Sequence, residues 1–282
     1  MLPQTERYLA LVHLGRNQWW RYALGAVVIL FCWLALGYLP YLWLAVTYPS
    51  DPLRDYIAVN FSIVMMLVGL ALTMRLLHRR PFMSLVGPDR GFAWLRIAQG
   101  AAAWSGIALV TIIIEHLLYP DRYYLSFNAD RFFLFAAVAL VMTPIQTTTE
   151  ELVFRGYLMQ SLALLMRRPA LIAALSALIF TLPHLLNPEV QHGPLLLAAS
   201  YFAIGLLLAV VTLRDGRLEL AIGVHAANNL MLALVANYEG SVLTSDSIFT
   251  ARELDPVYSL ISLSAGAVVF YWMFFARKNP AS

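Results

Sequence analysis

The stretch Thr147-Thr148-Thr149-Glu150-Glu151-Leu152-Val153-Phe154-Arg155-Gly156 places two carboxylates and one guanidinium inside an apolar segment of membrane length. Mostly apolar residues precede it over 132–142 and follow it over 157–162. A charged side chain near the centre of a bilayer costs at least ~2.5–3.5 kcal/mol on insertion scales, so three together need partners or a water-filled cavity. We therefore interpret this stretch as a functional site, and the other helices as the scaffold that supplies its partners.

The composition is that of a membrane protein. Hydrophobic residues make up 61% of the 282 residues and charged residues only 12%, which excludes an ordinary soluble domain. At ~20 residues per span plus short connections, the chain has room for about eight transmembrane helices. No repeat or low-complexity tract divides the chain. We predict an all-α, polytopic integral membrane protein that forms one transmembrane domain over residues 1–282, around an intramembrane catalytic cavity.

Eight apolar runs define the predicted helices. The first run is too long for the hydrophobic region of a signal peptide and lacks a small-residue cleavage site, so we keep it as a span. The predicted spans are 22–46, 56–77, 97–118, a long fourth helix from near 131 to the turn at 167–169, 170–186, 194–213, 220–236 and 257–276.

The basic residues alternate between the connections in a way that supports eight spans. The connections on one side hold only four of the 19, namely Arg54, Arg122, Arg131 and Arg252. Apart from Arg155, all the others fall at the termini or in connections on the opposite side. Since basic residues are enriched in cytoplasmic loops, both termini are predicted to face the cytoplasm.

Charge and cysteine content restrict the partners. The net charge of +3 is explained by the basic residues in the connections on the cytoplasmic side. We therefore expect the lipid bilayer as a partner and no nucleic acid. The single cysteine, Cys32, excludes an intrachain disulfide and a cysteine-based zinc cluster. All basic residues except Lys278 are arginine, a bias that indicates a GC-rich bacterial genome and hence a bacterial inner or cell membrane.

The charged stretch itself divides into a pair and a free acid. Glu151 and Arg155 are four residues apart with the acid first, the favourable orientation for an ion pair on one helix face. Glu150 is rotated from Glu151 by ~100° and can face a different neighbour. One carboxylate is therefore expected to be held by the arginine while the other remains available for chemistry.

Two further motifs lie within spans. Phe180 and His184 share one face of the fifth predicted helix, and His184 lies about as far after the Arg167-Arg168 turn as Glu150 lies before it. In an antiparallel hairpin the two fall at one depth, ~25 Å from the turn. His225 and Asn229 share a face of the seventh helix, where an amide can serve an oxyanion site. Their position relative to the basic end places the site toward the cytoplasmic half.

These three motifs together resemble those of the CAAX protease and bacteriocin-processing (Abi) family, which includes the type II CAAX prenyl endopeptidase. Glu150-Glu151-x-x-x-Arg155, Phe180-x-x-x-His184 and His225-x-x-x-Asn229 occur in the family's order, within a catalytic motif core over 130–235. The resemblance implies an intramembrane endopeptidase of the glutamic type without a cofactor.

The same resemblance implies a role for each residue. Glu150 would be the general base that activates a water, and His184 would help to hold that water. His225 and Asn229 would stabilise the oxyanion, and Glu151 with Arg155 would maintain the helix geometry. Asn228 lies beside Asn229, so the amide donor is uncertain by one residue.

Other functions remain compatible with these residues. Glu150, His184 and His225 could instead bind a catalytic zinc ion as a two-histidine, one-glutamate set. A non-catalytic immunity or scaffold protein and a transporter with a Glu/His proton relay are further alternatives, although no inverted repeat supports a transporter. For a protease, the expected substrates are peptide precursors or membrane-associated proteins, which the sequence does not name.

Overall fold

The computed structural model describes residues 2–48, 51, 53–89, 91–242 and 245–276. All eight predicted spans are helical in it. Six helical segments are long and apolar enough to cross a membrane, and two shorter apolar helices complete the predicted set. The chain is therefore an integral membrane protein. The six long segments are Trp19–Thr47, Leu53–His78, Trp94–Leu118, Ala129–Leu162, Pro194–Asp215 and Pro256–Ala276, and the two shorter ones are Pro169–His184 and Glu219–Val235.

The helices of the N-terminal half are α1 (Pro3–Ala10), η1 (Leu11–Leu14), α2 (Trp19–Phe31), η2 (Cys32–Leu36), α3 (Tyr38–Thr47), α4 (Leu53–Leu72), η3 (Thr73–His78), η4 (Phe82–Leu85) and α5 (Trp94–Leu118). Those of the C-terminal half are α6 (Ala129–Glu151), η5 (Leu152–Leu158), α7 (Met159–Leu162), α8 (Pro169–His184), η6 (Pro188–His192), α9 (Pro194–Asp215), α10 (Glu219–Leu230), η7 (Met231–Val235), α11 (Pro256–Tyr271) and η8 (Trp272–Ala276). The π-helical segments η2 and η5 each join two α-helices within one span, whereas η3, η7 and η8 are π-helical ends of helices and η1, η4 and η6 are short 3₁₀ helices.

Local sequence explains where several helices begin. Proline opens α8, α9 and α11, a position at which its missing N–H and fixed φ cost nothing. Asn128 caps α6 by accepting from the backbone N–H of Asp130, and Asp255 caps α11 by accepting from two backbone N–H groups. Each of these proline or capping residues lies within a few residues of the helix start that the sequence predicts.

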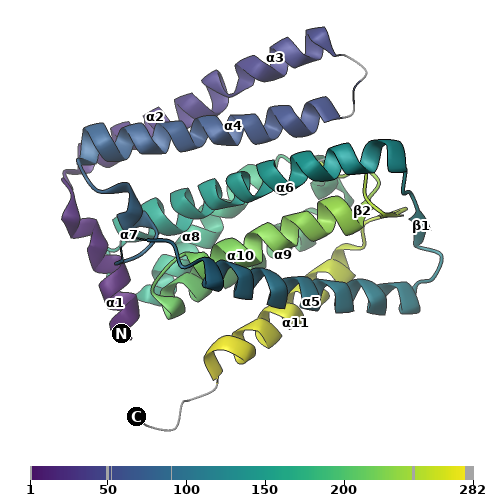
Figure 1. Ribbon diagram of the computed structural model, residues 1–282. Coiled ribbons are helices and arrows are strands. Elements are labelled where there is room, and N and C mark those ends of the chain that lie inside the picture. Colours follow the sequence, from purple (N-terminus) through teal and green to yellow (C-terminus); the bar gives the residue numbers. More distant parts are fainter. Residues whose placement is uncertain (1, 49–50, 52, 90, 243–244, 277–282) are drawn as a thin grey trace.

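The helices alternate in direction, and the start of α1 and the end of η8 lie at the same end of the bundle (Figure 1). We call this the inner end. The opposite, outer end carries a small sheet in the order β1-β3-β2, which the sequence did not predict because each strand has only three residues. β1 (Tyr123–Leu125) pairs antiparallel with β3 (Phe249–Ala251), and β2 (Ala236–Tyr238) pairs parallel with β3.

Helix α10 is the buried centre of the bundle although it is short. Its residues from Glu219 to Ala227 are all buried, and it packs closely against α5. Two glycines permit this approach: a Cβ on Gly100 would lie 2.3 Å from the carbonyl oxygen of Leu220, and one on Gly223 would lie 2.1 Å from that of Ile97. Small residues at helix crossings are typical of membrane proteins, where close packing replaces the hydrophobic effect.

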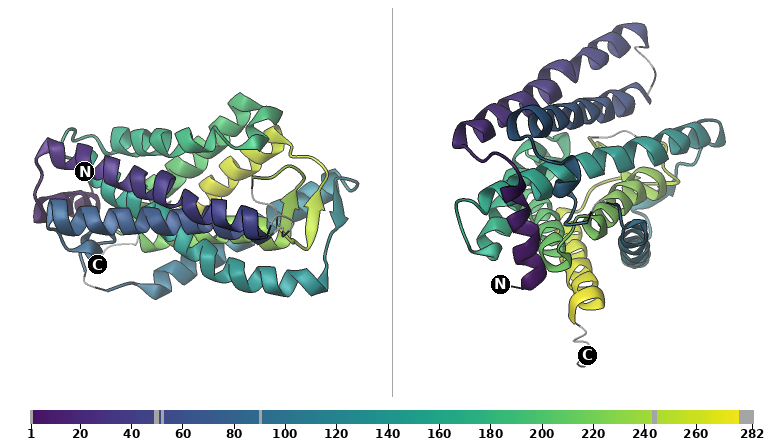
Figure 2. Two further views of the ribbon diagram at one scale, coloured as in Figure 1. Left: turned by 90° about the horizontal axis from the view of Figure 1, so that it is seen from above. Right: turned by 60° about the vertical axis from the view of Figure 1, so that its left-hand side comes forward.

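The first helical hairpin lies to one side of this centre. Helices α2, α3 and α4 form a layer that packs on α6, as Figures 1 and 2 show from three directions. Large apolar side chains such as Trp43 and Val46 are exposed on it, at 61% and 84%. An exposed apolar surface of this kind is what a lipid-facing helix presents.

Candidate active site

The buried ion pair predicted from the opening stretch is present. Nη1 of Arg155 lies 2.9 Å from Oε1 of Glu151, and neither side chain is exposed. Arg155 also donates to the backbone carbonyl of Gly205 on α9, at 3.0 Å, and its guanidinium lies 4.4 Å from the ring centroid of Phe180 on α8. A single arginine in the middle of η5 therefore joins three helical segments.

Glu151 has a second partner that the sequence analysis did not assign. Nδ1 of His225 lies 2.8 Å from the same Oε1 that pairs with Arg155. The other ring nitrogen, Nε2, lies 3.7 Å from Oε2 of Glu150. His225 is thus held between the two adjacent carboxylates, and Glu151 fixes the orientation of the histidine as well as pairing with the arginine.

Glu150 faces a cavity and is held by a residue one turn earlier. Its side chain is 8% exposed. Nε2 of Gln146 donates to Oε1 of Glu150 at 3.1 Å. The carbonyl oxygen of the same Gln146 side chain has no hydrogen-bond partner among the described residues. Sequence reasoning missed Gln146, although its spacing of four residues places it on the Glu150 face of the helix.

His184 is oriented by its neighbours on both sides. Its Nδ1 lies 2.8 Å from the carbonyl oxygen of Phe180, one turn back on α8. Its ring lies between the ring of Phe180, at a centroid distance of 4.6 Å, and that of Tyr201 on α9, at 4.7 Å. The predicted pairing of Phe180 with His184 on one face is confirmed, whereas Tyr201 was not foreseen.

The two asparagines of α10 have different surroundings. The Asn228 side-chain oxygen accepts from Nε1 of Trp104, at 3.1 Å, and its amide donates to Oδ1 of Asn229 at 3.2 Å. The Asn229 amide has no partner in the part of the chain that the structure describes. Asn229 is therefore the better-placed donor toward a ligand, and Asn228 orients it.

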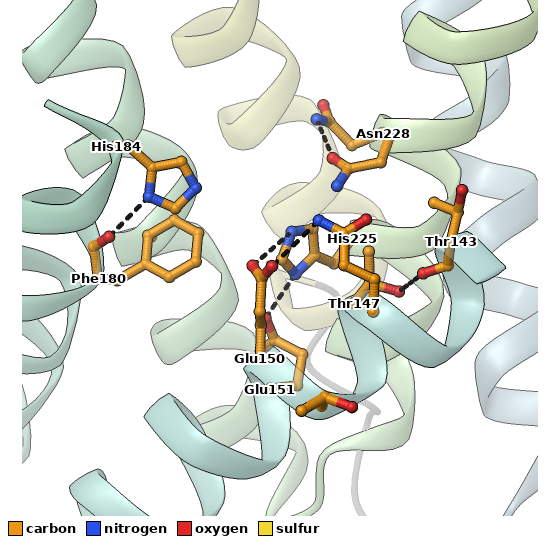
Figure 3. A network of polar contacts seen from close by, with 12 residues as sticks. Thr143, Thr147, Glu150, Glu151, Phe180, His184, His225 and Asn228 are labelled. Carbon is orange, nitrogen blue, oxygen red and sulfur yellow. Dashed lines mark hydrogen bonds and ion pairs between the residues drawn. The ribbon is translucent and has the colours of Figure 1, made fainter. Parts of the chain in front are cut away.

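These residues surround one cavity of about 300 Å³. Glu150, His184, His225 and Asn229 all line it, from three helices, and Figure 3 shows the first three around a common space. Apolar side chains of the first hairpin, among them Trp33 and Ile63, complete its wall. The predicted cavity is thus present, and each of the three motifs contributes at least one polar residue to it.

The alternative zinc centre would need donors from Glu150, His184 and His225 around one point. Among the described residues, no three His, Cys, Asp or Glu side chains are placed so that they could hold a metal ion.

The fold and the cavity define a polytopic membrane protein with a buried glutamate and two histidines at its centre. The family described as type II CAAX prenyl endopeptidase Rce1-like matches residues 130–231, the segment that holds all three motifs. The chain is also 30% identical over 273 residues to the uncharacterized protein YyaK of Bacillus subtilis, covering 91% of each chain. The chain belongs to this Rce1-like family of membrane proteins.

No solved structure matches the chain. The similarity to a bacterial protein agrees with the bacterial origin indicated by the arginine bias.

Proposed function

We propose that the chain is an intramembrane endopeptidase of the glutamic type. The observation that carries this proposal is the meeting of Glu150, His184 and His225 in one cavity, with Nε2 of His225 3.7 Å from Oε2 of Glu150. Membership of a family described as an endopeptidase supports the reaction type. The resulting chemistry is hydrolysis of a peptide bond by an activated water molecule.

Glu150 is the proposed general base. It takes a proton from water while the water oxygen attacks the carbonyl carbon of the substrate, and the proton then passes to the departing amine. Gln146 holds one carboxylate oxygen of Glu150 and leaves the other directed toward His225. His184 is the proposed second contact of the water, because its Nδ1 is engaged by Phe180 and its Nε2 is the remaining polar atom of the ring.

Asn229 and His225 are the proposed donors to the oxyanion. The Asn229 amide lines the cavity without a partner in the described structure. His225 donates from Nε2 only when both ring nitrogens carry hydrogen, since Nδ1 is given to Glu151. The carboxylates of Glu150 and Glu151 supply the counter-charge for that form. Oxyanion donors of this kind typically contribute ~10²–10³-fold to the rate.

Glu151, Arg155 and Phe180 are proposed to position the site. The ion pair and the arginine–ring contact lie behind the catalytic groups and are fully buried. Substrates are proposed to be membrane-associated proteins or peptide precursors. The protein is further proposed to lie in a bacterial cell membrane with both termini in the cytoplasm, an orientation that the distribution of its basic residues supports.

Glu150→Gln tests the proposal. The amide keeps the shape and most hydrogen bonds of the carboxylate, but it cannot accept the proton from water. Membranes from cells that express either form are compared by mass spectrometry of newly formed peptide termini, and a peptide that covers a cleavage site is then used with purified protein. We expect a loss of at least ~10²–10⁴-fold. Glu6→Gln, at an exposed carboxylate of α1 outside the cavity, is the matched control and should cleave normally.

Chelators separate the glutamic from the zinc mechanism. We expect cleavage by the purified protein to persist in a strong chelator at neutral pH. Loss of cleavage that zinc restores, together with a zinc content that Glu150→Gln abolishes, would support the metalloprotease instead. Full activity in Glu150→Gln would contradict both mechanisms.

A further inference from the structure

The cavity is closed at the inner end of the bundle. On the inner side of Glu150 lie Glu151 and Arg155, and neither side chain has any exposed surface. The amphipathic helix α1 seals this floor: the hydroxyl of Tyr8, which is fully buried, donates to the backbone carbonyls of Leu85, at 2.9 Å, and of Arg155, at 3.1 Å. No residue of α1 or of the inner turns at 163–168 and 216–218 lines the cavity. Among the described residues, the cavity therefore has no opening toward the inner end.

At the other end, the cavity extends from the catalytic groups to the outer loops. Its lining continues through Asn187 and Glu189, which follow α8, and through Tyr238 and Val242, which follow α10. Val242 is 40% exposed, so the lining reaches the surface there. Asn187, Glu189, Tyr238 and Val242 form the rim of the cavity at this end. Glu189 is only 2% exposed and links two segments there, because it accepts from the hydroxyl of Tyr201 on α9 at 2.6 Å and from the backbone N–H of Val242 at 3.1 Å.

The outer end of the bundle, where this rim lies, carries predominantly negative charges. Each basic residue of the outer end already has a partner: Arg54, Arg122 and Arg131 form ion pairs with acids, and Arg252 lies over the ring of Tyr124. The described structure shows no ion pair for five exposed acids at the same end, namely Asp51, Asp121, Asp130, Glu239 and Glu253. A passage that opens at an end with charges mainly of one sign draws ligands of the opposite sign toward it.

We infer that the cavity is filled from the outer end and that the segments it receives are cationic. This inference rests on the proposed protease function and specifies its substrates. Since the basic residues place the inner end in the cytoplasm, the substrates are peptide segments with excess lysine or arginine that lie on the extracytoplasmic face of the membrane. The prediction that the site lies toward the cytoplasmic half concerns the closed end of the cavity, whereas the entrance of the cavity lies at the outer end.

Cysteine labelling tests this inference without requiring catalysis. Cys32→Ala removes the only thiol, and single cysteines are then introduced by Gln146→Cys in the cavity, Val242→Cys at the outer end and Leu165→Cys at the inner turn. Val242 and Leu165 are 40% and 81% exposed, so these two variants report the two faces of the membrane. Membrane-impermeant methanethiosulfonates are applied to right-side-out and to inverted vesicles.

We expect Gln146→Cys and Val242→Cys to react in right-side-out vesicles and Leu165→Cys only in inverted ones. We also expect the trimethylammonium reagent to modify Gln146→Cys faster than the sulfonate reagent, by about tenfold or more beyond their ratio on a free thiol. Modification of Gln146→Cys from the inner side, the side from which Leu165→Cys reacts, would overturn the inference. So would reaction only with a membrane-permeant reagent, which indicates lateral entry, and so would an equal or faster sulfonate reaction.

The position of the entrance and the proposed mechanism can be refuted independently of each other. If Glu150→Gln abolishes cleavage but the cavity is labelled from the inner side, the protease assignment stands and the entrance is wrong. If the labelling is as expected but Glu150→Gln cleaves normally, the entrance stands and the mechanism is wrong.

Discussion

Replacing Arg155 with methionine removes the central cation of the site while keeping most of the side-chain volume. In the structure the guanidinium contacts the Glu151 carboxylate at 2.9 Å and the Gly205 carbonyl at 3.0 Å, and no part of it is exposed. After Arg155→Met, the Glu151 carboxylate keeps only its contact with His225. A carboxylate is then left in a dry interior without its strongest counter-charge.

The expected cost is large because the pair is fully buried. Breaking a buried ion pair by removing one partner typically destabilises a protein by ~3–5 kcal/mol, since the remaining charge is uncompensated. That is a substantial part of the ~5–15 kcal/mol by which proteins are usually stable, so the yield of folded protein should fall as well. The exposed Arg167 on the inner turn is the control, and Arg167→Met should change stability by less than ~0.5 kcal/mol.

The measurement is reversible unfolding in mixed micelles, followed by tryptophan fluorescence of purified protein. Adding Glu151→Gln to Arg155→Met removes the orphaned charge and should recover part of the loss, as an interaction free energy of ~0.5–3 kcal/mol. A free energy of unfolding for Arg155→Met within ~0.5 kcal/mol of the unmodified protein would refute the structural role. A stable but inactive variant would show instead that the arginine acts on substrate or transition state.

Two further predictions concern the oxyanion donor and the topology. Asn229→Ala should lower cleavage by ~10²–10³-fold, measured with the peptide identified above, whereas Asn228→Ala should cost less because it only orients the donor; the reverse order would assign the role to Asn228. Reporter fusions after residue 190 should read extracytoplasmic and those after residue 168 cytoplasmic, and a reversal of either would contradict the orientation derived from the arginines.

Much of the architecture follows from local sequence. Continuous apolar runs define all eight helices, because a backbone in hydrocarbon must satisfy its own hydrogen bonds. The spacing of four residues defines two contacts directly, Glu151 with Arg155 and Phe180 with His184. It also defines the helix face that His225 and Asn229 share. The equal depth of Glu150 and His184 follows from counting residues to the turn between their helices.

Contacts between distant segments were not predictable in this way. The bond between Glu151 and His225 joins residues 74 positions apart, and the contact of Trp104 with Asn228 joins residues 124 apart. Both depend on which faces of α5, α6 and α10 meet. Between α5 and α10, Gly100 and Gly223 allow the two backbones to approach closely. Periodicity identifies a face of a helix but not the neighbour that the face meets.

The sequence by itself determined that the chain spans the membrane and that its charged residues must gather in a protected site, because hydrocarbon does not tolerate isolated charges. Only the tertiary structure decided how the groups are shared: Glu151 holds His225, Gln146 holds Glu150, and Tyr201 stacks on His184. It also decided the direction of the cavity. Closure by Tyr8 of α1 and opening beside Val242 depend on the packing of segments far apart in the chain, which no local pattern encodes.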